Sequence, residues 1–170
     1  MAITRLNNNS ITSVTTLPSG IDVGKVVQVL QAITNTNTQA SSSTWVDLNG
    51  CSITITPTTS TSKFLLTCSI QTSLNATTSH QEVNSNIRYV KNGAALYGTN
   101  VWSGYSIKMP SARVDHFART TLNVSYLDTS SHTTADITFK IQGVSEQSGE
   151  VISFAESNST SFFQVMEILA

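Results

Sequence analysis

The chain contains few charged residues. Of its 170 residues, nine are Lys or Arg and ten are Asp or Glu, which is 11% of the chain with a formal net charge of −1. An average soluble domain carries about 25% charged residues. Because Lys and Arg are not in surplus, strong nucleic-acid binding through phosphate contacts is excluded. Apolar residues still make up 39% of the chain, so ordinary disorder, which combines low hydrophobicity with high net charge, is excluded as well.

Long apolar runs are also missing. They stop at about four residues, whereas a transmembrane helix needs about twenty. Near the start, Arg5 and Leu6 are followed by three asparagines at the place where the apolar part of a signal peptide would begin. We therefore expect synthesis in a cytoplasm, no export by a cleaved signal and no membrane insertion.

Two cysteines, Cys51 and Cys68, are too few for a disulfide scaffold. If residues 57–62 form a hairpin loop in which Thr56 faces Lys63, the same register places Cys51 opposite Cys68, and a cross-strand bridge is conceivable. The alternative is two free, half-buried thiols, because cytosolic proteins rarely keep disulfides.

Uncharged polar residues replace the missing charge: Ser and Thr together number 50, and Asn numbers 13. Thr, Val and Ile favour strands, whereas Ser and Asn favour turns. Strand patterns recur in the segments 25–33, 45–48, 52–56, 63–71, 86–91, 94–97, 122–126, 137–141 and 161–169. The pair Asn92-Gly93 predicts a two-residue hairpin, and Asn49-Gly50 predicts a turn. With no helical stretch between about eight strands, we predict an all-β fold, an antiparallel β-sandwich or jelly roll.

Residues 1–24 lack this regularity and read as an Asn run followed by Ser and Thr with isolated apolar residues. This pattern predicts an extended N-terminal arm, ordered only against another surface, ahead of a β-sandwich knob at 25–170. The candidate residues for attachment are Ile3, Arg5, Leu6 and Ile11. The alternative is an unattached terminus.

The last strand is apolar on both faces. Phe162, Met166 and Ile168 lie on one face, and Phe163, Val165 and Leu169 lie on the other. In a two-layer sandwich only one face meets the core, so the other must be covered by a subunit interface or by a long loop. We take Phe162, Phe163, Val165 and Ile168 as candidates for a homotrimer interface. Glu167 lies among them, either paired with a nearby Arg or Lys or placed at the rim.

The sequence offers no catalytic, metal or cofactor site. His80, His116 and His132 are too widely separated for metal-ligand spacing. Asp115 and His116, beside Arg113 and Arg119, are best interpreted as local charge pairs. The segment Asp128-Thr129-Ser130 resembles the Asp-Thr-Gly loop of aspartic proteases but has Ser where that loop needs Gly. We therefore expect no enzymatic activity and no cofactor.

The segment 97–110 is the most suggestive for binding, because it combines aromatic residues with glycines. Tyr97, Trp102 and Tyr105 are candidate receptor contacts, since aromatic rings give contact area at low entropy cost. The alternative is that these rings cap the core or the subunit interface.

Four strings of the sequence resemble small tail-fibre-like or head-decoration-like virion proteins of tailed bacteriophages. They are the opening Met-Ala-Ile-Thr-Arg-Leu-Asn-Asn-Asn-Ser-Ile, the segments 17–29 and 55–66, and the terminal Val-Met-Glu-Ile-Leu-Ala. The resemblance runs along most of the chain and is strongest at its two ends. The strand order also resembles trimeric jelly rolls of the tumour-necrosis-factor and complement-C1q type, which end in an apolar strand near the trimer axis.

This resemblance implies a homotrimeric knob on a virion, made in the host cytoplasm. The first hypothesis is a tail-fibre or receptor-binding knob that contacts a host surface glycan or protein. The second is a capsid decoration protein, a cement or head-fibre protein, that stabilises the head. A polysaccharide-cleaving spike is a third, and it lacks an identifiable pair of carboxylates. Partners would be other copies of the chain and tail or capsid proteins, with no nucleic acid.

Overall fold

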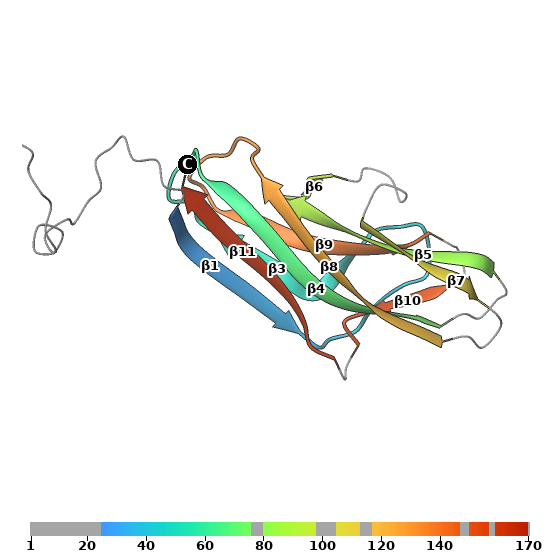
Figure 1. The fold of residues 1–170 in the computed structure, drawn as a ribbon. Coiled ribbons are helices and arrows are strands. Elements are labelled where there is room, and N and C mark those ends of the chain that lie inside the picture. Colours follow the sequence, from blue (N-terminus) through green and yellow to red (C-terminus); the bar gives the residue numbers. More distant parts are fainter. Residues whose placement is uncertain are drawn as a thin grey trace, which may run out of the picture.

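The computed structural model describes residues 25–75, 80–97, 105–112, 117–146, 150–156 and 159–169. Within these residues the chain forms eleven strands and no helix (Figure 1). In chain order the strands are β1 (Lys25–Thr34), β2 (Thr38–Ala40), β3 (Val46–Ile55), β4 (Lys63–Asn75), β5 (His80–Lys91), β6 (Ala94–Ala95), β7 (Tyr105–Ala112), β8 (Phe117–Asp128), β9 (Ile137–Ser145), β10 (Val151–Phe154) and β11 (Ser161–Leu169). No helix in this part of the chain is long and apolar enough to cross a membrane.

The strands form two antiparallel sheets. The first runs β1-β11-β4-β10-β2, and β8 pairs with β4; the second runs β3-β9-β5-β6, and β7 pairs with β5. Strands distant in sequence are neighbours in space, so β11 lies between β1 and β4 (Figure 1). From β3 onward the chain passes repeatedly from one sheet to the other, and two antiparallel sheets connected in this way and packed face to face make a jelly roll. The predicted all-β antiparallel sandwich is therefore confirmed.

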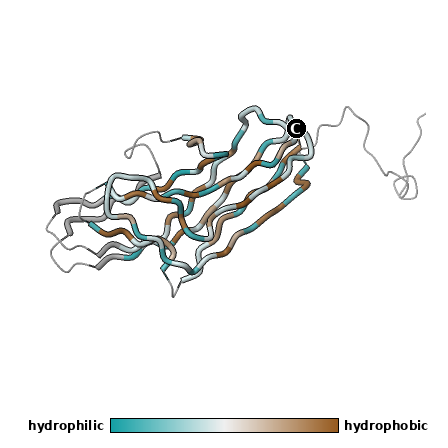
Figure 2. The backbone as a smooth tube through the Cα atoms, turned by 180° about the vertical axis from the view of Figure 1, so that it is seen from behind, coloured by the Kyte–Doolittle hydropathy of each residue, from teal (hydrophilic) through white to brown (hydrophobic). Residues whose placement is uncertain are grey.

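Period-two hydrophobicity places the core between the sheets. On β4 the side chains of Phe64, Leu66, Cys68 and Ile70 are buried, and alternate residues point outward. The same alternation is visible as changing colour along the strands in Figure 2. Tyr89 of β5 stacks on Phe163 of β11 with 5.7 Å between ring centroids, and its hydroxyl donates to the Val124 carbonyl at 2.9 Å. The core thus joins both sheets.

The predicted hairpin at Asn92-Gly93 is confirmed. It connects β5 to β6, with Lys91 paired to Ala94, and both turn residues have positive φ, 49° and 84°. The Asn92 side-chain oxygen also accepts a hydrogen bond from the backbone N–H of Thr138 at 2.8 Å. The turn residues therefore hold β9 as well as their own hairpin.

The predicted turn at Asn49-Gly50 is wrong. The chain continues through these residues as one strand, β3, and the register against β9 shifts between Asp47 and Ser52. Gly50 has φ 73°, and a Cβ at this position would lie 2.7 Å from Thr34 Oγ1. Asn-Gly therefore makes a bulge in β3 where the backbone approaches the end of β1.

The predicted hairpin loop at residues 57–62 is also wrong. The loop leaves β3 in one sheet and enters β4 in the other, so Cys51 and Cys68 are not cross-strand neighbours. Both cysteines are free and buried. Burial raises the pKa of the Cys51 thiol to about 12, with a contribution from Cys68, and raises the pKa of Cys68 to about 11. Of the two alternatives, the structure selects free thiols that are un-ionised at neutral pH.

Candidate interaction surface

The last strand has the two predicted faces. Phe163, Val165 and Glu167 point into the sandwich and are fully buried, whereas Phe162, Met166 and Ile168 lie on the outer side and are half-buried. The side chains of Phe163 and Val165 thus belong to the subunit's own hydrophobic core. Of the predicted interface residues, only Phe162 and Ile168 lie where a second subunit could contact them.

The strand register extends this outer side into a continuous surface over four strands. Met166 is paired with Val29 of β1 and Leu65 of β4, and Leu65 is paired with Leu127 of β8. Paired residues of neighbouring strands lie on the same face of a sheet. We define the outer apolar face by its members on β1, β4, β8 and β11: Val26, Val29, Ile33, Leu65, Leu127, Phe162, Met166 and Ile168.

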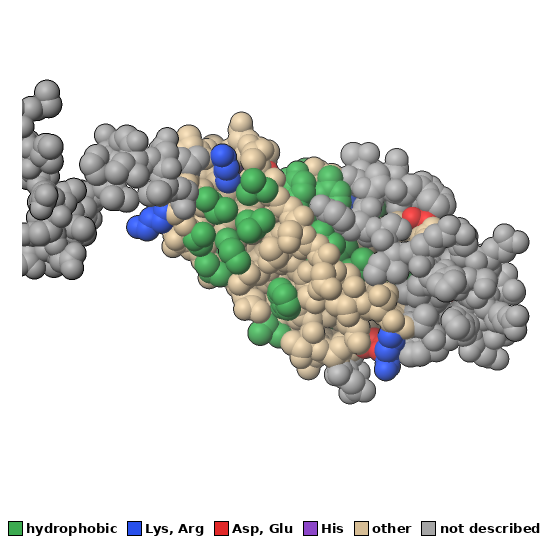
Figure 3. Space-filling model, in the orientation of Figure 1, with side chains coloured by type: hydrophobic (Ala, Val, Ile, Leu, Met, Phe, Trp, Pro, Cys, Tyr) green, Lys and Arg blue, Asp and Glu red, His purple; other side chains and the backbone are tan. Residues whose placement is uncertain are grey.

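The β1 side of this face is the most exposed. The exposed fractions are 48% for Val26, 52% for Val29 and 66% for Ile33, and Leu127 on β8 is 47% exposed. Figure 3 shows hydrophobic side chains gathered over one end of this sheet, with basic side chains at their margin and a smaller group further along. Grouped apolar exposure of this kind marks an interaction surface in soluble proteins.

Most residues of the outer apolar face were not among the predicted interface residues. The predicted interface residues all lie on β11, because the last segment is the clearest in the sequence to carry apolar residues on both faces. Two signals were present in the sequence: Leu65 interrupts the alternation between Phe64 and Leu66, and segment 25–33 is apolar at six of its nine positions. What the sequence did not contain was the pairing of β1 with β11, which brings the two doubly apolar strands together.

Glu167 is neither paired with a basic residue nor placed at a rim. The side chain is fully buried, and its described partners are all uncharged. Oε1 accepts from the backbone N–H of Thr58 and the hydroxyl of Ser62, both at 2.6 Å. Oε2 accepts from the Gln28 amide at 2.8 Å and the Thr58 hydroxyl at 3.0 Å. Burial alone would raise the pKa of Glu167, but these hydrogen bonds outweigh burial and lower it.

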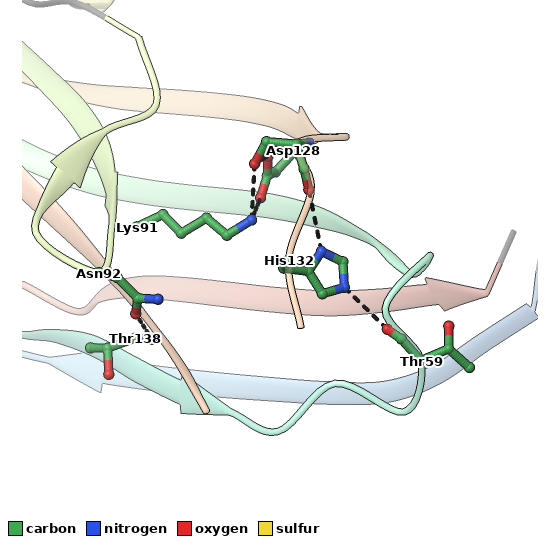
Figure 4. A network of polar contacts seen from close by, with 7 residues as sticks. Thr59, Lys91, Asn92, Asp128, His132 and Thr138 are labelled. Carbon is green, nitrogen blue, oxygen red and sulfur yellow. Dashed lines mark hydrogen bonds and ion pairs between the residues drawn. The ribbon is translucent and has the colours of Figure 1, made fainter. Parts of the chain in front are cut away.

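Asp128 and His132 belong to a second polar network (Figure 4). Asp128 Oδ2 accepts from Lys91 Nζ at 2.8 Å, and Oδ1 accepts from the backbone N–H and hydroxyl of Ser130 at 2.9 and 2.6 Å. The ring nitrogens of His132 lie 3.2 Å from the Ser130 carbonyl and 3.1 Å from that of Thr59. Asp128 thus organises its own turn, and His132 links this turn to the loop at 57–62.

Of the predicted receptor contacts, the structure describes the side chain of Tyr97. This ring is half-buried at the edge of the sandwich, with centroids 6.2 Å from Tyr89 and 5.2 Å from Tyr126. Tyr97 therefore caps the core, which was the alternative interpretation. Tyr105 begins β7, and its side chain lies outside the description, as does all of Trp102.

Several other predicted residues fall outside the described part of the chain. These are the attachment candidates Ile3, Arg5, Leu6 and Ile11, together with Arg113, Asp115 and His116; for His80 only the backbone is described, at the start of β5. Arg119 forms an ion pair with Glu156 at 2.9 Å. Among the described residues, no three His, Cys, Asp or Glu side chains are grouped closely enough to hold a metal ion.

Comparisons with known proteins do not assign this chain to a family. No protein-family model matches the sequence, and no curated protein matches it. Among solved structures, dimeric latent PorU from Porphyromonas gingivalis is similar over 84% of this chain, with 11% sequence identity and a TM-score of 0.40. The chain covers 13% of the length of PorU. A likeness at this level carries no argument about function.

Proposed function

We propose that this protein is a non-enzymatic structural protein of a phage virion, a homotrimeric tail-fibre knob that contacts the host receptor. The observation that carries the proposal is the outer apolar face, with Ile33 66% exposed at its β1 side. Fully burying a side chain such as Val or Ile contributes about 1.5–3 kcal/mol, so covering this face favours assembly. The net charge of −1 leaves little repulsion between copies.

The resemblance to small virion proteins supplies the rest of the proposal. Residues 1–24, with Ile3, Arg5, Leu6 and Ile11, would attach the knob to the particle. Trp102, together with Tyr105 at the start of β7, would contact a glycan or protein of the host surface. Three identical sites per trimer turn weak single contacts into useful attachment through avidity.

The oligomeric state tests the interface. Sedimentation of the full chain is expected to give a trimer, and Ile33→Asp is expected to give monomers, because a carboxylate buried between subunits has no partner there. Ser52→Asp is the matched control, since Ser52 is exposed on β3 in the opposite sheet. A monomeric wild-type chain, or an Ile33→Asp variant as trimeric as the control, would contradict the proposed interface.

The position in the particle separates the tail-fibre hypothesis from the capsid decoration hypothesis. A tail-fibre knob occurs in few copies, whereas a cement or head-fibre protein occurs in numbers comparable to the capsid subunits. Densitometry of purified virions is therefore expected to show this chain far below the major capsid protein. Near-equal amounts would replace the tail-fibre proposal by capsid decoration.

Host binding tests the receptor role. The isolated trimer is expected to bind host cells, and Trp102→Ala is expected to weaken binding at least tenfold, about 1.4 kcal/mol per site. Unchanged binding of the variant to host cells would show that Trp102 does not contact the receptor. Release of reducing sugars from host glycans by the wild-type protein would contradict the non-enzymatic role and support a cleaving spike.

A further inference from the structure

A polar row crosses the outer apolar face. Gln31 of β1 is paired with Gln164 of β11, Gln164 with Thr67 of β4, and Thr67 with Ser125 of β8. On one side of this row lie Val29, Met166, Leu65 and Leu127, and on the other lie Ile33 and Phe162. Figure 3 shows the same division, with tan surface between the larger and the smaller hydrophobic group. We call these four residues the polar row.

The two glutamines of the polar row carry donors that the described residues of the subunit do not use. Thr67 donates its hydroxyl to the Gln164 side-chain oxygen at 3.4 Å. The side-chain NH₂ groups of Gln31 and Gln164 make no hydrogen bond to any described residue. In the free subunit water satisfies these donors. Once a partner covers the neighbouring apolar side chains, each donor left without an acceptor destabilises the assembly.

We propose, on the basis of the homotrimeric assembly proposed above, that the glutamines of the polar row meet the same glutamines of the other two copies around the trimer axis and fix the register between subunits. A glutamine amide has two donor hydrogens and an acceptor oxygen, so equivalent glutamines of three copies around one axis can satisfy one another. Two purely apolar surfaces can slide against each other at little cost in free energy. Buried amide groups, in contrast, find hydrogen-bond partners in only a few alignments of the two subunits. Single polar residues specify register and oligomeric state in this way in coiled coils.

The distribution of charge favours a copy of this chain as the partner. Lys63 lies on this side of the sheet at the start of β4, paired with Ile168, and Lys25 lies at the start of β1, paired with Leu169 of the opposite side. They can stay at the rim while the uncharged centre is covered. An acidic or basic partner would have no counter-charge to meet at the polar row, whereas another copy presents the same amides and hydroxyls.

The test compares Gln164→Leu and the double variant Gln31→Leu/Gln164→Leu with the wild-type chain by native mass spectrometry. Both variants are expected to remain associated, because leucine adds apolar surface to the interface, and the double variant also removes both amide donors. They are expected to distribute over two or more oligomeric states, whereas the wild-type chain forms a single trimer. Gln71→Leu is the matched control, since Gln71 lies on the same side of β4 beyond the residues paired with β11, and it is expected to behave as wild type.

Each outcome has a definite meaning. A single trimeric species in both leucine variants would overturn the register role while leaving the homotrimer intact, and so would dissociation into monomers, because the row would then supply affinity. A monomeric wild-type chain would overturn the trimer and the register role together. A wild-type chain that is monomeric alone but binds another virion protein through this face would replace the second copy as occupant.

Discussion

Glu167 shows how a single charge can be buried without a counter-charge. An isolated buried carboxylate is very costly, and a protein lowers that cost by pairing it or by surrounding it with hydrogen-bond donors. Here the donors are Thr58, Ser62 and Gln28, all uncharged. They come from β1 and from the loop between β3 and β4, so Glu167 ties both to β11. The carboxylate therefore has a structural role, because it holds these two segments against β11.

Replacing Glu167 by glutamine tests this role. The amide nitrogen cannot accept the hydrogen bonds that Oε1 or Oε2 accepts, so two buried donors lose their acceptor. Glu167→Gln is expected to lower the free energy of unfolding by roughly 2–4 kcal/mol at neutral pH, measured by urea denaturation. The control is Glu156→Gln, which removes a carboxylate paired with an exposed arginine and keeps an amide oxygen that can accept from the Ser73 hydroxyl. That change is expected to lower the free energy of unfolding by less than about 1 kcal/mol. Equal losses in the two variants would contradict the structural role of Glu167.

The pH dependence of this effect follows from the direction of the pKa shift. The pKa of Glu167 is lowered in the folded state, so its stabilisation is fully present above the unfolded-state value of about 4.3. It is lost as the pH falls through the lower, folded-state pKa. The difference in unfolding free energy between wild type and Glu167→Gln is therefore expected to shrink below about pH 4. A difference independent of pH between 7 and 3, measured by urea denaturation across that range, would show that the carboxylate charge does not matter.

At the scale of elements, the same dipeptide has two outcomes. Asn92-Gly93 turns the chain, whereas Asn49-Gly50 forms a bulge within β3. Both glycines have positive φ, which Gly adopts without steric cost. The difference lies in the surroundings, because a Cβ at Gly50 would meet Thr34 while a Cβ at Gly93 would meet open space. The dipeptide alone therefore does not decide between a turn and a bulge, and at Gly50 the contact with Thr34 leaves no room for a side chain.

This pair gives a matched test of packing against backbone strain. Gly93→Ala introduces strain alone and is expected to cost about 1 kcal/mol in urea denaturation. Gly50→Ala adds a clash with Thr34 and is expected to cost about 2–4 kcal/mol, with the larger shift of the unfolding midpoint. Equal losses would mean that the end of β1 moves freely away from β3.

At the scale of the whole molecule, the low charge and the outer apolar face both affect how copies of this chain associate. Association that depends on apolar contact with charges only at the rim should respond little to ionic strength. The association constant of the trimer, measured by sedimentation, is expected to change less than about threefold between about 50 mM and about 500 mM NaCl. A steep fall with salt would place ion pairs in the interface.

The sequence predicted much of the fold and little of the surface. Alternation at Phe64, Leu66, Cys68 and Ile70 was enough to identify the core side of β4, because burial on one face imposes a period of two. Pairing of β1 with β11 depends on contacts more than a hundred residues apart, which no local pattern contains. The outer apolar face arises from that pairing, and so it was recognised only in part.

By itself, the sequence determined that this chain is an antiparallel β protein with an uncharged polar surface, since composition and alternation act locally on every strand. Tertiary structure decided the rest. It separated Phe163 and Val165, which fill the core, from Phe162 and Ile168, which face outward, and it surrounded Glu167 with uncharged donors. The physical reason is that strand order and register are set by the packing of the whole sandwich, and only they determine which side chains meet.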